Sequence, residues 1–309
     1  MNTQSETMTE SLQARTAAPA NISSNQAFLW SVRRELWENR SLYLAPLAVA
    51  AFALIAFSLS SILGIWQQQL RVAESVHTLP GPEQPYDMAA GLLMGTSLIV
   101  SLFYCIDALY GERRDRSILF WKSLPVSDLT TVLSKACIPL LVVPLITFLV
   151  TVALQWLMLL VSSAVLLASG QSAATLWRSL PLAGMWLILL YHLITAHAIW
   201  PFPVYCWLLL VSAWARRAPF LWAALPLVAI AGVEGIIFRT SRFAGMIGRR
   251  FIGEAPAMTM GPNSVGLDPA TTHATVGRYL GSLDLWVGLL IAALFLAATV
   301  RLRRDRGPV

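Results

Sequence analysis

The chain has 309 residues, of which 57% are hydrophobic and only 12% are charged, and its formal net charge is +6. Because a soluble domain usually carries about a quarter charged residues, this composition excludes a soluble enzyme and predicts a membrane protein. At about 20 residues for each membrane-spanning helix, the length accommodates about six such helices and leaves no room for a large extra domain.

The first 40 residues divide into two segments. Residues 1–22 are rich in Ser, Thr, Ala and Gln without periodicity, which predicts a disordered cytoplasmic tail rather than a signal peptide. Residues 23–40 repeat apolar side chains at helical intervals, with Trp30 and Trp37 as candidate interface anchors. We expect an amphipathic helix on the inner membrane surface. The alternative is a plain extension of the first span.

Residues 41–300 form the predicted transmembrane domain, in which six apolar segments are each long enough to cross about 30 Å of hydrocarbon. Their approximate bounds are 42–66, 89–109, 138–162, 181–208, 218–238 and 281–300. The fourth segment lies in a region too long for one straight helix and contains Pro201 and Pro203, which should kink or break it. The sequence therefore predicts an all-α polytopic membrane protein.

The distribution of Lys and Arg sets the expected orientation. With the N-terminus inside, the cytoplasmic side holds about twice as many of these residues as the outer side, so we expect both termini in the cytoplasm. Residues 301–309 form a basic tail, read as a topology anchor that meets anionic lipid rather than nucleic acid. The outer segment 239–280 also carries arginines, and within it 243–252 is either a short re-entrant helix or an exposed loop.

The most informative stretch is the loop from Tyr110 to Lys135. A cytoplasmic loop needs charge to orient the protein, but the apolar core at 118–121 within that charge suggests docking to a partner. The pattern predicts a short transverse helix that begins at the charged residues Glu112 to Arg116, continues to Ser123 and ends before Pro125. Ser127 or Asp128 is expected to cap the helix that leads into the third span.

This loop resembles that of the permease subunits of type-two ATP-binding cassette exporters. The matching positions are Glu112, Arg113, Ser123, Leu124, Pro125, Val126, Ser127 and Lys135. The six-span layout and the entrance helix also match, and the family tends to place short re-entrant helices before its last span. The resemblance implies a cytoplasmic coupling helix that sits in a groove of a separate ATPase subunit, and two permeases, identical or sister, in one exporter. The side chains expected to contact the ATPase are Glu112, Arg113, Arg114, Asp115, Arg116, Phe120 and Trp121.

The chain itself cannot be a P-loop ATPase. A P-loop requires a Gly-Lys-Ser/Thr step, and the two lysines, Lys122 and Lys135, both lack a preceding glycine. We therefore expect no cofactor in this chain and expect ATP and Mg²⁺ in the partner. The resemblance implies export across a bacterial inner membrane by alternating access, of a substrate that the sequence does not identify but that the family suggests is amphiphilic.

Few other side chains suggest a catalytic, ion-binding or gating role. Asp107 near the inner end of the second span is a candidate interface partner of Arg113 or Arg114. Glu234 and Asp284 are candidates for an outer gate, because ionisable groups inside spans are costly. The remaining polar residues, whose spacing does not suit a metal or catalytic site, are His192, His197 and the three cysteines Cys105, Cys137 and Cys206.

Two alternatives to an exporter subunit stay open. A secondary transporter or channel would use Asp107, Glu234 or Asp284 as ion or proton sites. A non-transporting scaffold or sensor subunit would use the loop between the second and third spans only to recruit a cytoplasmic protein. A gene for an ATPase beside the gene for this chain would favour the exporter over both.

Overall fold

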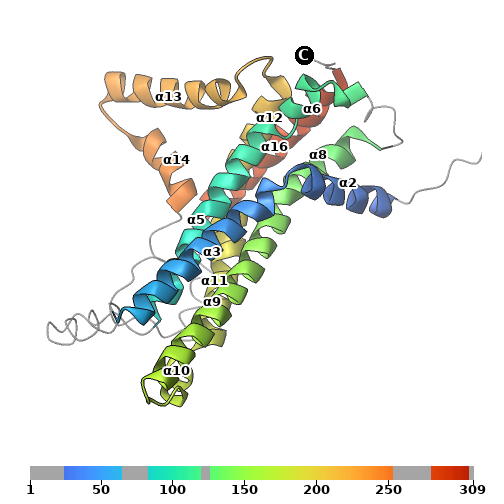
Figure 1. Cartoon of the computed structure of the whole chain (residues 1–309). Helices are drawn as coiled ribbons and strands as arrows, with labels where there is room; N and C mark the ends of the chain where they lie inside the picture. Colours follow the sequence, from blue (N-terminus) through green and yellow to red (C-terminus); the bar gives the residue numbers. More distant parts are fainter. Residues whose placement is uncertain (1–23, 65–82, 120–125, 253–279, 306–309) are drawn as a thin grey trace, which may run out of the picture.

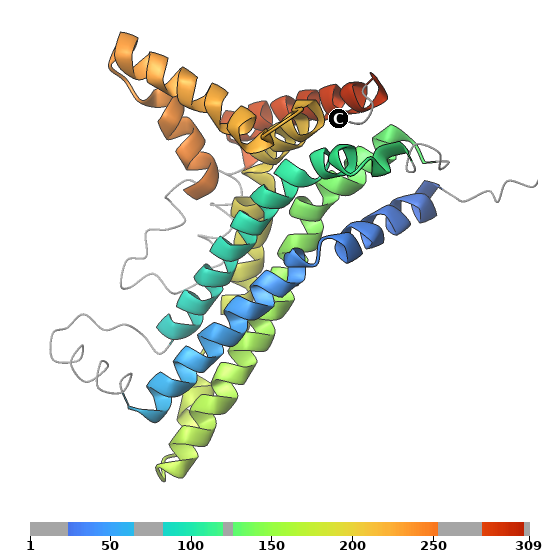
Figure 2. The same cartoon turned by 45° about the horizontal axis from the view of Figure 1, so that its top comes forward.

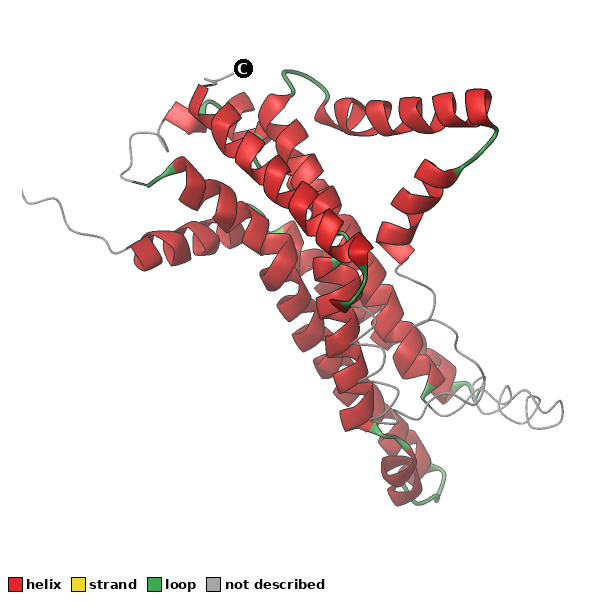
Figure 3. Ribbon diagram, turned by 180° about the vertical axis from the view of Figure 1, so that it is seen from behind, coloured by secondary structure: helices red, strands yellow, loops and turns green. Residues whose placement is uncertain are grey.

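The computed structural model describes residues 24–64, 83–119, 126–252 and 280–305, and the regular elements within these ranges are all helices (Figure 3). Six of the helices are long and apolar enough to cross a membrane. The predicted all-α fold with six membrane-spanning helices is thus confirmed for the described part of the chain. The predicted N-terminal tail, 1–22, lies outside it.

The helices below are those within the described ranges. In chain order they are α2 (Ser24–Glu38), α3 (Ser41–Ile62), α5 (Gln84–Asp107), α6 (Tyr110–Arg114), α8 (Asp128–Cys137), η1 (Ile138–Val142), α9 (Val143–Ala168), α10 (Ala174–Ser179), α11 (Leu182–His192), η2 (Leu193–Ile199), α12 (Phe202–Trp214), α13 (Pro219–Phe238), α14 (Arg242–Ile252) and α16 (Leu283–Asp305), where η1 and η2 are π-helical. A helix therefore lies at Ser24–Glu38, where the sequence predicts an amphipathic one.

One half of the bundle is built from α3, α5 and α9, which run side by side (Figures 1 and 2). Their contact buries an apolar core that includes Tyr86, Leu93, Leu154, Met158 and Leu159. α8, η1 and α9 form one continuous helix of 41 residues. At 1.5 Å per residue this helix is about 60 Å long, about twice the hydrocarbon thickness, so it extends well beyond the predicted span.

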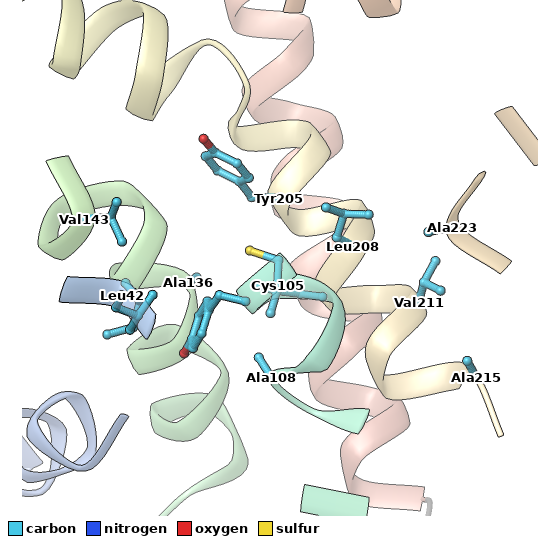
Figure 4. Close-up of a cluster of buried hydrophobic side chains, with 13 residues drawn as sticks. Leu42, Cys105, Ala108, Ala136, Val143, Tyr205, Leu208, Val211, Ala215 and Ala223 are labelled. Carbon is cyan, nitrogen blue, oxygen red and sulfur yellow. The ribbon is translucent and has the colours of Figure 1, made fainter. Parts of the chain in front are cut away.

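The other half packs α12 against α16 and α5. Figure 4 shows its core, where Cys105 of α5 meets Tyr205 and Leu208 of α12, with Leu42 of α3 and Val143 close by. These side chains are at most 7% exposed. The cysteines are buried or half-buried and unpaired, in agreement with the prediction of packed thiols.

The fourth predicted span is broken, as its prolines suggest. α11 passes into η2, a turn follows at Trp200 and Pro201, and α12 then begins at Phe202. The Trp200 amide donates to the carbonyl of Thr195, five residues earlier, at 2.9 Å. Pro203 lies in the first turn of α12, where a missing N–H costs nothing.

The fifth predicted span is a helix, but it stands away from the bundle. α13 projects sideways in Figure 1, and only 6% of its most apolar stretch is buried, with Ala223 as its buried residue. A helix that is apolar on every face and unpacked needs lipid or protein around it. α14 runs back from the far end of α13 to the bundle, so residues 243–252 are helical and do not form an exposed loop.

Candidate functional site: an ionic cluster at one end of the bundle

Four helix segments meet at what we term the charged end of the bundle: α2, α6, the first turns of α8 and the last turns of α16. They lie together near the C-terminus in Figure 1. α6 follows α5 after only Ala108 and Leu109, which holds it close to the bundle. Ser127 caps α8, because its Oγ accepts a hydrogen bond from the amide of Thr130 at 3.1 Å.

The first pair of the cluster joins α8 to α2. Lys135 Nζ donates to Glu35 Oε1 at 2.8 Å, and both side chains are almost fully buried. The hydroxyl of Tyr104 on α5 donates to the other carboxylate oxygen of Glu35 at 2.9 Å. Both oxygens of this buried carboxylate therefore have donors, as a buried charge requires.

Glu112 of α6 lies at the centre of the cluster. Its Oε1 accepts from Arg34 Nη2 at 2.8 Å and lies 3.1 Å from Lys135 Nζ. Its Oε2 accepts from Arg303 Nη1 at 2.7 Å. Because Arg34 also donates to Glu35 at 2.7 Å, one guanidinium joins the two carboxylates. Glu112 thus ties α6 to α2, α8 and α16.

Arg303 joins the cluster to a second carboxylate, on α8. Its Nε donates to Asp128 Oδ1 in the first turn of α8 at 3.1 Å, and the residue is only 5% exposed. α16 therefore continues as a helix into the predicted basic tail and buries one of its arginines there. The network joins three cations to four carboxylates, of which Glu38, 3.5 Å from Arg34, is the most exposed; the others are Arg34, Lys135, Arg303, Glu35, Glu112 and Asp128.

The cluster is stable only when it is complete. Removing charges from water costs several kcal/mol per ion, and the ion pairs offset this cost only if each charge keeps its partners. Burial opposes the charge of Arg34, but the carboxylates of Glu35 and Glu112 outweigh it and raise the pKa of Arg34 above its ordinary value. The geometry therefore favours one fixed arrangement of the helix ends.

Arg113 attaches α6 to a further helix. Its Nη1 donates to the carbonyls of Ala213 at 2.7 Å and Ala215 at 3.0 Å, at the end of α12. At the start of α6, the amides of Leu109 and Tyr110 donate to Ser212 Oγ at 3.0 and 2.8 Å. The unpaired carbonyls at the end of α12 thus receive a cation, the favourable partner for a helix C-terminus.

The expected helix from Glu112 to Ser123 is not continuous, and this prediction needs correction. α6 ends at Arg114, and Arg116 adopts a left-handed backbone conformation with a φ of 57°, before residues 117–119 are helical again. A non-glycine residue with positive φ interrupts a right-handed helix. The physical reason is tertiary, because Glu112 and Arg113 are held by four other helices.

The predicted partner-binding residues therefore separate into two groups. Glu112 and Arg113 are 7% and 5% exposed and form bonds inside this chain, so they are not presented to a partner. Arg114, Asp115 and Arg116 are exposed. Phe120 and Trp121 lie outside the described residues. Beside the exposed group, Asp107 lies 3.9 Å from Arg114, which is the inner pair anticipated from the sequence.

Glu234 and Asp284, the candidates for an outer gate, lie apart in the structure. Glu234 accepts hydrogen bonds from the amides of Arg242 and Phe243, both at 2.8 Å, and so caps the start of α14. Asp284 lies at the other end of α14, where its main-chain carbonyl accepts from Arg250 Nη2 at 2.6 Å. The two residues therefore lie at opposite ends of an 11-residue helix.

The end of α14 is fixed to the bundle by an arginine. The Arg250 guanidinium lies 4.5 Å from the centre of the Trp200 ring and donates to the Trp200 carbonyl at 3.3 Å. The Trp200 indole in turn donates to the carbonyl of Arg249 at 2.7 Å. α14 therefore joins the break between η2 and α12 to the start of α16.

Each of the two described histidines has one ring nitrogen near a hydrogen-bonding partner. His197 is buried, with its Nε2 2.9 Å from Ser97 Oγ, and His192 Nδ1 lies 2.9 Å from the carbonyl of Ile188. In the part of the chain that the structure describes, no group of three or more His, Cys, Asp and Glu side chains is arranged to hold a metal ion.

Sequence reasoning missed the cluster because its members lie far apart. Lys135 and Glu35 are separated by 100 positions, and Arg303 and Glu112 by 191. One signal was available, since charged residues of both signs lie beside apolar runs in residues 23–40, 128–137 and 301–305. Each such charge is costly unless a partner is found.

No protein-family model matches the chain, and no curated protein or solved structure matches it. The described helices fit a multi-pass membrane protein by length and composition. Within it, the charged end connects α2, α5, α6, α8, α12 and α16 through named polar contacts.

Proposed function

We propose that this chain is the membrane-spanning subunit of an exporter driven by a separate ATP-binding cassette ATPase, with the charged end in the cytoplasm. The proposal rests on the loop resemblance together with one structural observation. α6, a helix of five residues, uses its two buried charged side chains to hold the ends of four other helices.

Such an arrangement is suited to transmit a movement of α6 to the membrane-spanning helices. Arg114, Asp115 and Arg116 are exposed and form the docking surface. Glu112 and Arg113, directly before them in the chain, connect that surface to α2, α8, α16 and α12. A displacement of α6 by a partner therefore moves several helix ends together rather than bending a free loop.

The mechanism proposed is alternating access. Nucleotide binding draws two ATPase subunits together, each moves the α6 segment of one permease, and the spans change from inward-open to outward-open. ATP and Mg²⁺ act in the partner, and the two permeases are identical or sister chains. This chain supplies the docking surface, the rigid attachment of α6 and the membrane path.

Site-specific photo-crosslinking in native membranes tests this proposal. A photoreactive amino acid at Arg116 should give an adduct with a protein that carries a Gly-Lys-Ser/Thr P-loop, identified by mass spectrometry. The same amino acid at Arg178 in α10, at the opposite end of the bundle, serves as the control and should not give that adduct.

The identity of the crosslinked protein distinguishes the exporter from the scaffold alternative. An adduct at Arg116 that contains a P-loop protein supports the exporter. An adduct only with proteins that bind no nucleotide supports the scaffold alternative and contradicts the exporter. Crosslinking of a P-loop protein with equal yield at Arg178 would contradict the proposed docking surface.

A further inference from the structure

α2 presents two opposite faces of different chemistry. One face carries Glu35, which is 1% exposed and bound within the ionic cluster. The other face carries Trp30 and Trp37, whose exposed fractions are 65% and 70%, and Leu29, which is 65% exposed. At 100° per residue, Glu35 lies nearly opposite to these side chains. The ion pairs therefore fix which side of α2 faces outward.

Arg33 lies between the two exposed indoles. Its guanidinium carbon is 5.5 Å from the centre of the Trp30 ring and 5.4 Å from that of Trp37. Both distances lie within the range of a cation–π interaction. Among the described residues no carboxylate lies within 4 Å of Arg33, so its charge remains available to a ligand. Arg40, in the short connection between α2 and α3, is exposed as well.

The position of α2 places this stripe at a membrane surface. Only Asn39 and Arg40 separate α2 from α3, a helix long and apolar enough to cross a membrane. Figures 1 and 2 show α2 running outward from the end of α3, away from the bundle. Exposed tryptophans at such a position are typical of the boundary between head groups and acyl chains.

We propose that Trp30, Arg33 and Trp37 form a binding site for the head group of an anionic phospholipid. The indoles enter the head-group layer, and the planar guanidinium between them donates to the lipid phosphate, a pairing that suits arginine better than lysine. Arg40, exposed two residues after the end of α2, adds a second positive charge at this end of the helix. The site does not depend on an ATPase partner and so stands apart from the proposed function.

Native mass spectrometry of the full purified chain tests the site. The chain, with any subunit that co-purifies, is titrated in mild detergent with dioleoylphosphatidylglycerol or with dioleoylphosphatidylcholine, and the fraction that retains lipid is measured. Arg33→Gln should bind phosphatidylglycerol about fivefold more weakly, because each basic side chain near a membrane surface contributes about 1 kcal/mol. The matched control Arg217→Gln, an exposed arginine between α12 and α13, should bind as the wild type does.

A second variant distinguishes loss of the lipid site from misfolding of the chain. The double change Trp30→Ala and Trp37→Ala removes the indoles and keeps the charge, and it should also weaken phosphatidylglycerol binding with an unchanged thermal unfolding midpoint. Equal binding of phosphatidylglycerol by wild type and Arg33→Gln would overturn the proposal. An equal loss in Arg217→Gln would overturn it too, as would displacement of the lipid by millimolar inorganic phosphate.

Discussion

Lys135 shows what a single buried charge does in this molecule. Its ammonium is 1% exposed and contacts the carboxylates of Glu35 and Glu112. Neither carboxylate can turn to water, since both are also buried. Removal of the ammonium therefore leaves buried negative charge that Arg34 and Arg303 only partly neutralise.

We predict that Lys135→Met destabilises the chain by about 3 kcal/mol, the lower end of the range for breaking a buried ion pair. The free energy of unfolding in mixed micelles measures this change. The matched control Arg301→Ala, on an exposed position of α16, should change it by less than about 0.5 kcal/mol. A Lys135→Met protein as stable as the wild type would show that the cluster is not a structural element.

Gly288 is required by the arginine that fixes α14. A Cβ at this position would lie 2.7 Å from Arg250 Nη1 and 2.8 Å from Nη2, so the guanidinium would have to move away from α16. Its bonds to the carbonyls of Trp200 and Asp284 depend on the present position.

We predict that Gly288→Ala costs about 1 kcal/mol of stability, and that the same change costs almost nothing once Arg250→Ala is present. A double-mutant cycle in mixed micelles measures the coupling. Gly232→Ala on α13, where a Cβ meets nothing within 4 Å, is the control and should not destabilise. Additive effects of the changes at 288 and 250 would contradict this contact.

At the level of elements, the attachment of α6 to α12 depends on Arg113. We predict that Arg113→Ala increases amide hydrogen exchange in residues 108–119, because the carbonyls of Ala213 and Ala215 lose their donor. Hydrogen exchange with mass spectrometry measures this. The neighbouring Arg114→Ala should leave exchange unchanged, since that side chain is exposed. Equal amide protection in the Arg113→Ala and Arg114→Ala variants would contradict this attachment of α6 to α12.

The sequence predicted the elements better than their junctions. Apolar length was enough to predict six helices long and apolar enough to cross a membrane, and Pro201 was enough to predict the break before α12. The course of the loop after α5 was predicted wrongly, because a continuous helix from Glu112 ignores the bonds that hold Glu112 and Arg113. Local pattern carries no information about such long-range partners.

At the level of the whole molecule, the ionic cluster lies at one end of the bundle. The charged end gathers helix ends from separate parts of the chain, whereas the sequence could predict only which charges flank each span. Likewise, nothing in the sequence predicted that α13 stands away from the bundle, since an evenly apolar helix has no preferred face for packing. The composition thus predicted the class of protein, and the three-dimensional pairing supplied the site.

We predict that the two bundle ends face opposite sides of the membrane. A single cysteine at Arg304, in a variant lacking the three native cysteines, should react with an impermeant maleimide only after the cytoplasmic side is opened. A cysteine at Gln171, between α9 and α10, should react in intact cells. Labelling of both positions from the same side would contradict the orientation expected from the basic residues.

The most direct test of the central claim is a pull-down of the tagged chain from its native membranes in mild detergent, with ATPase activity measured on the eluate. We predict a co-purifying P-loop ATPase with wild type and with Arg301→Glu, and its loss with the double change Arg114→Glu and Arg116→Glu, whose stability should be unchanged. Elution of the chain alone and without ATPase activity, from membranes that contain the ATPase, would contradict an ATP-driven exporter. Asp107, Glu234 and Asp284 would then be the residues to test for a transporter that works alone.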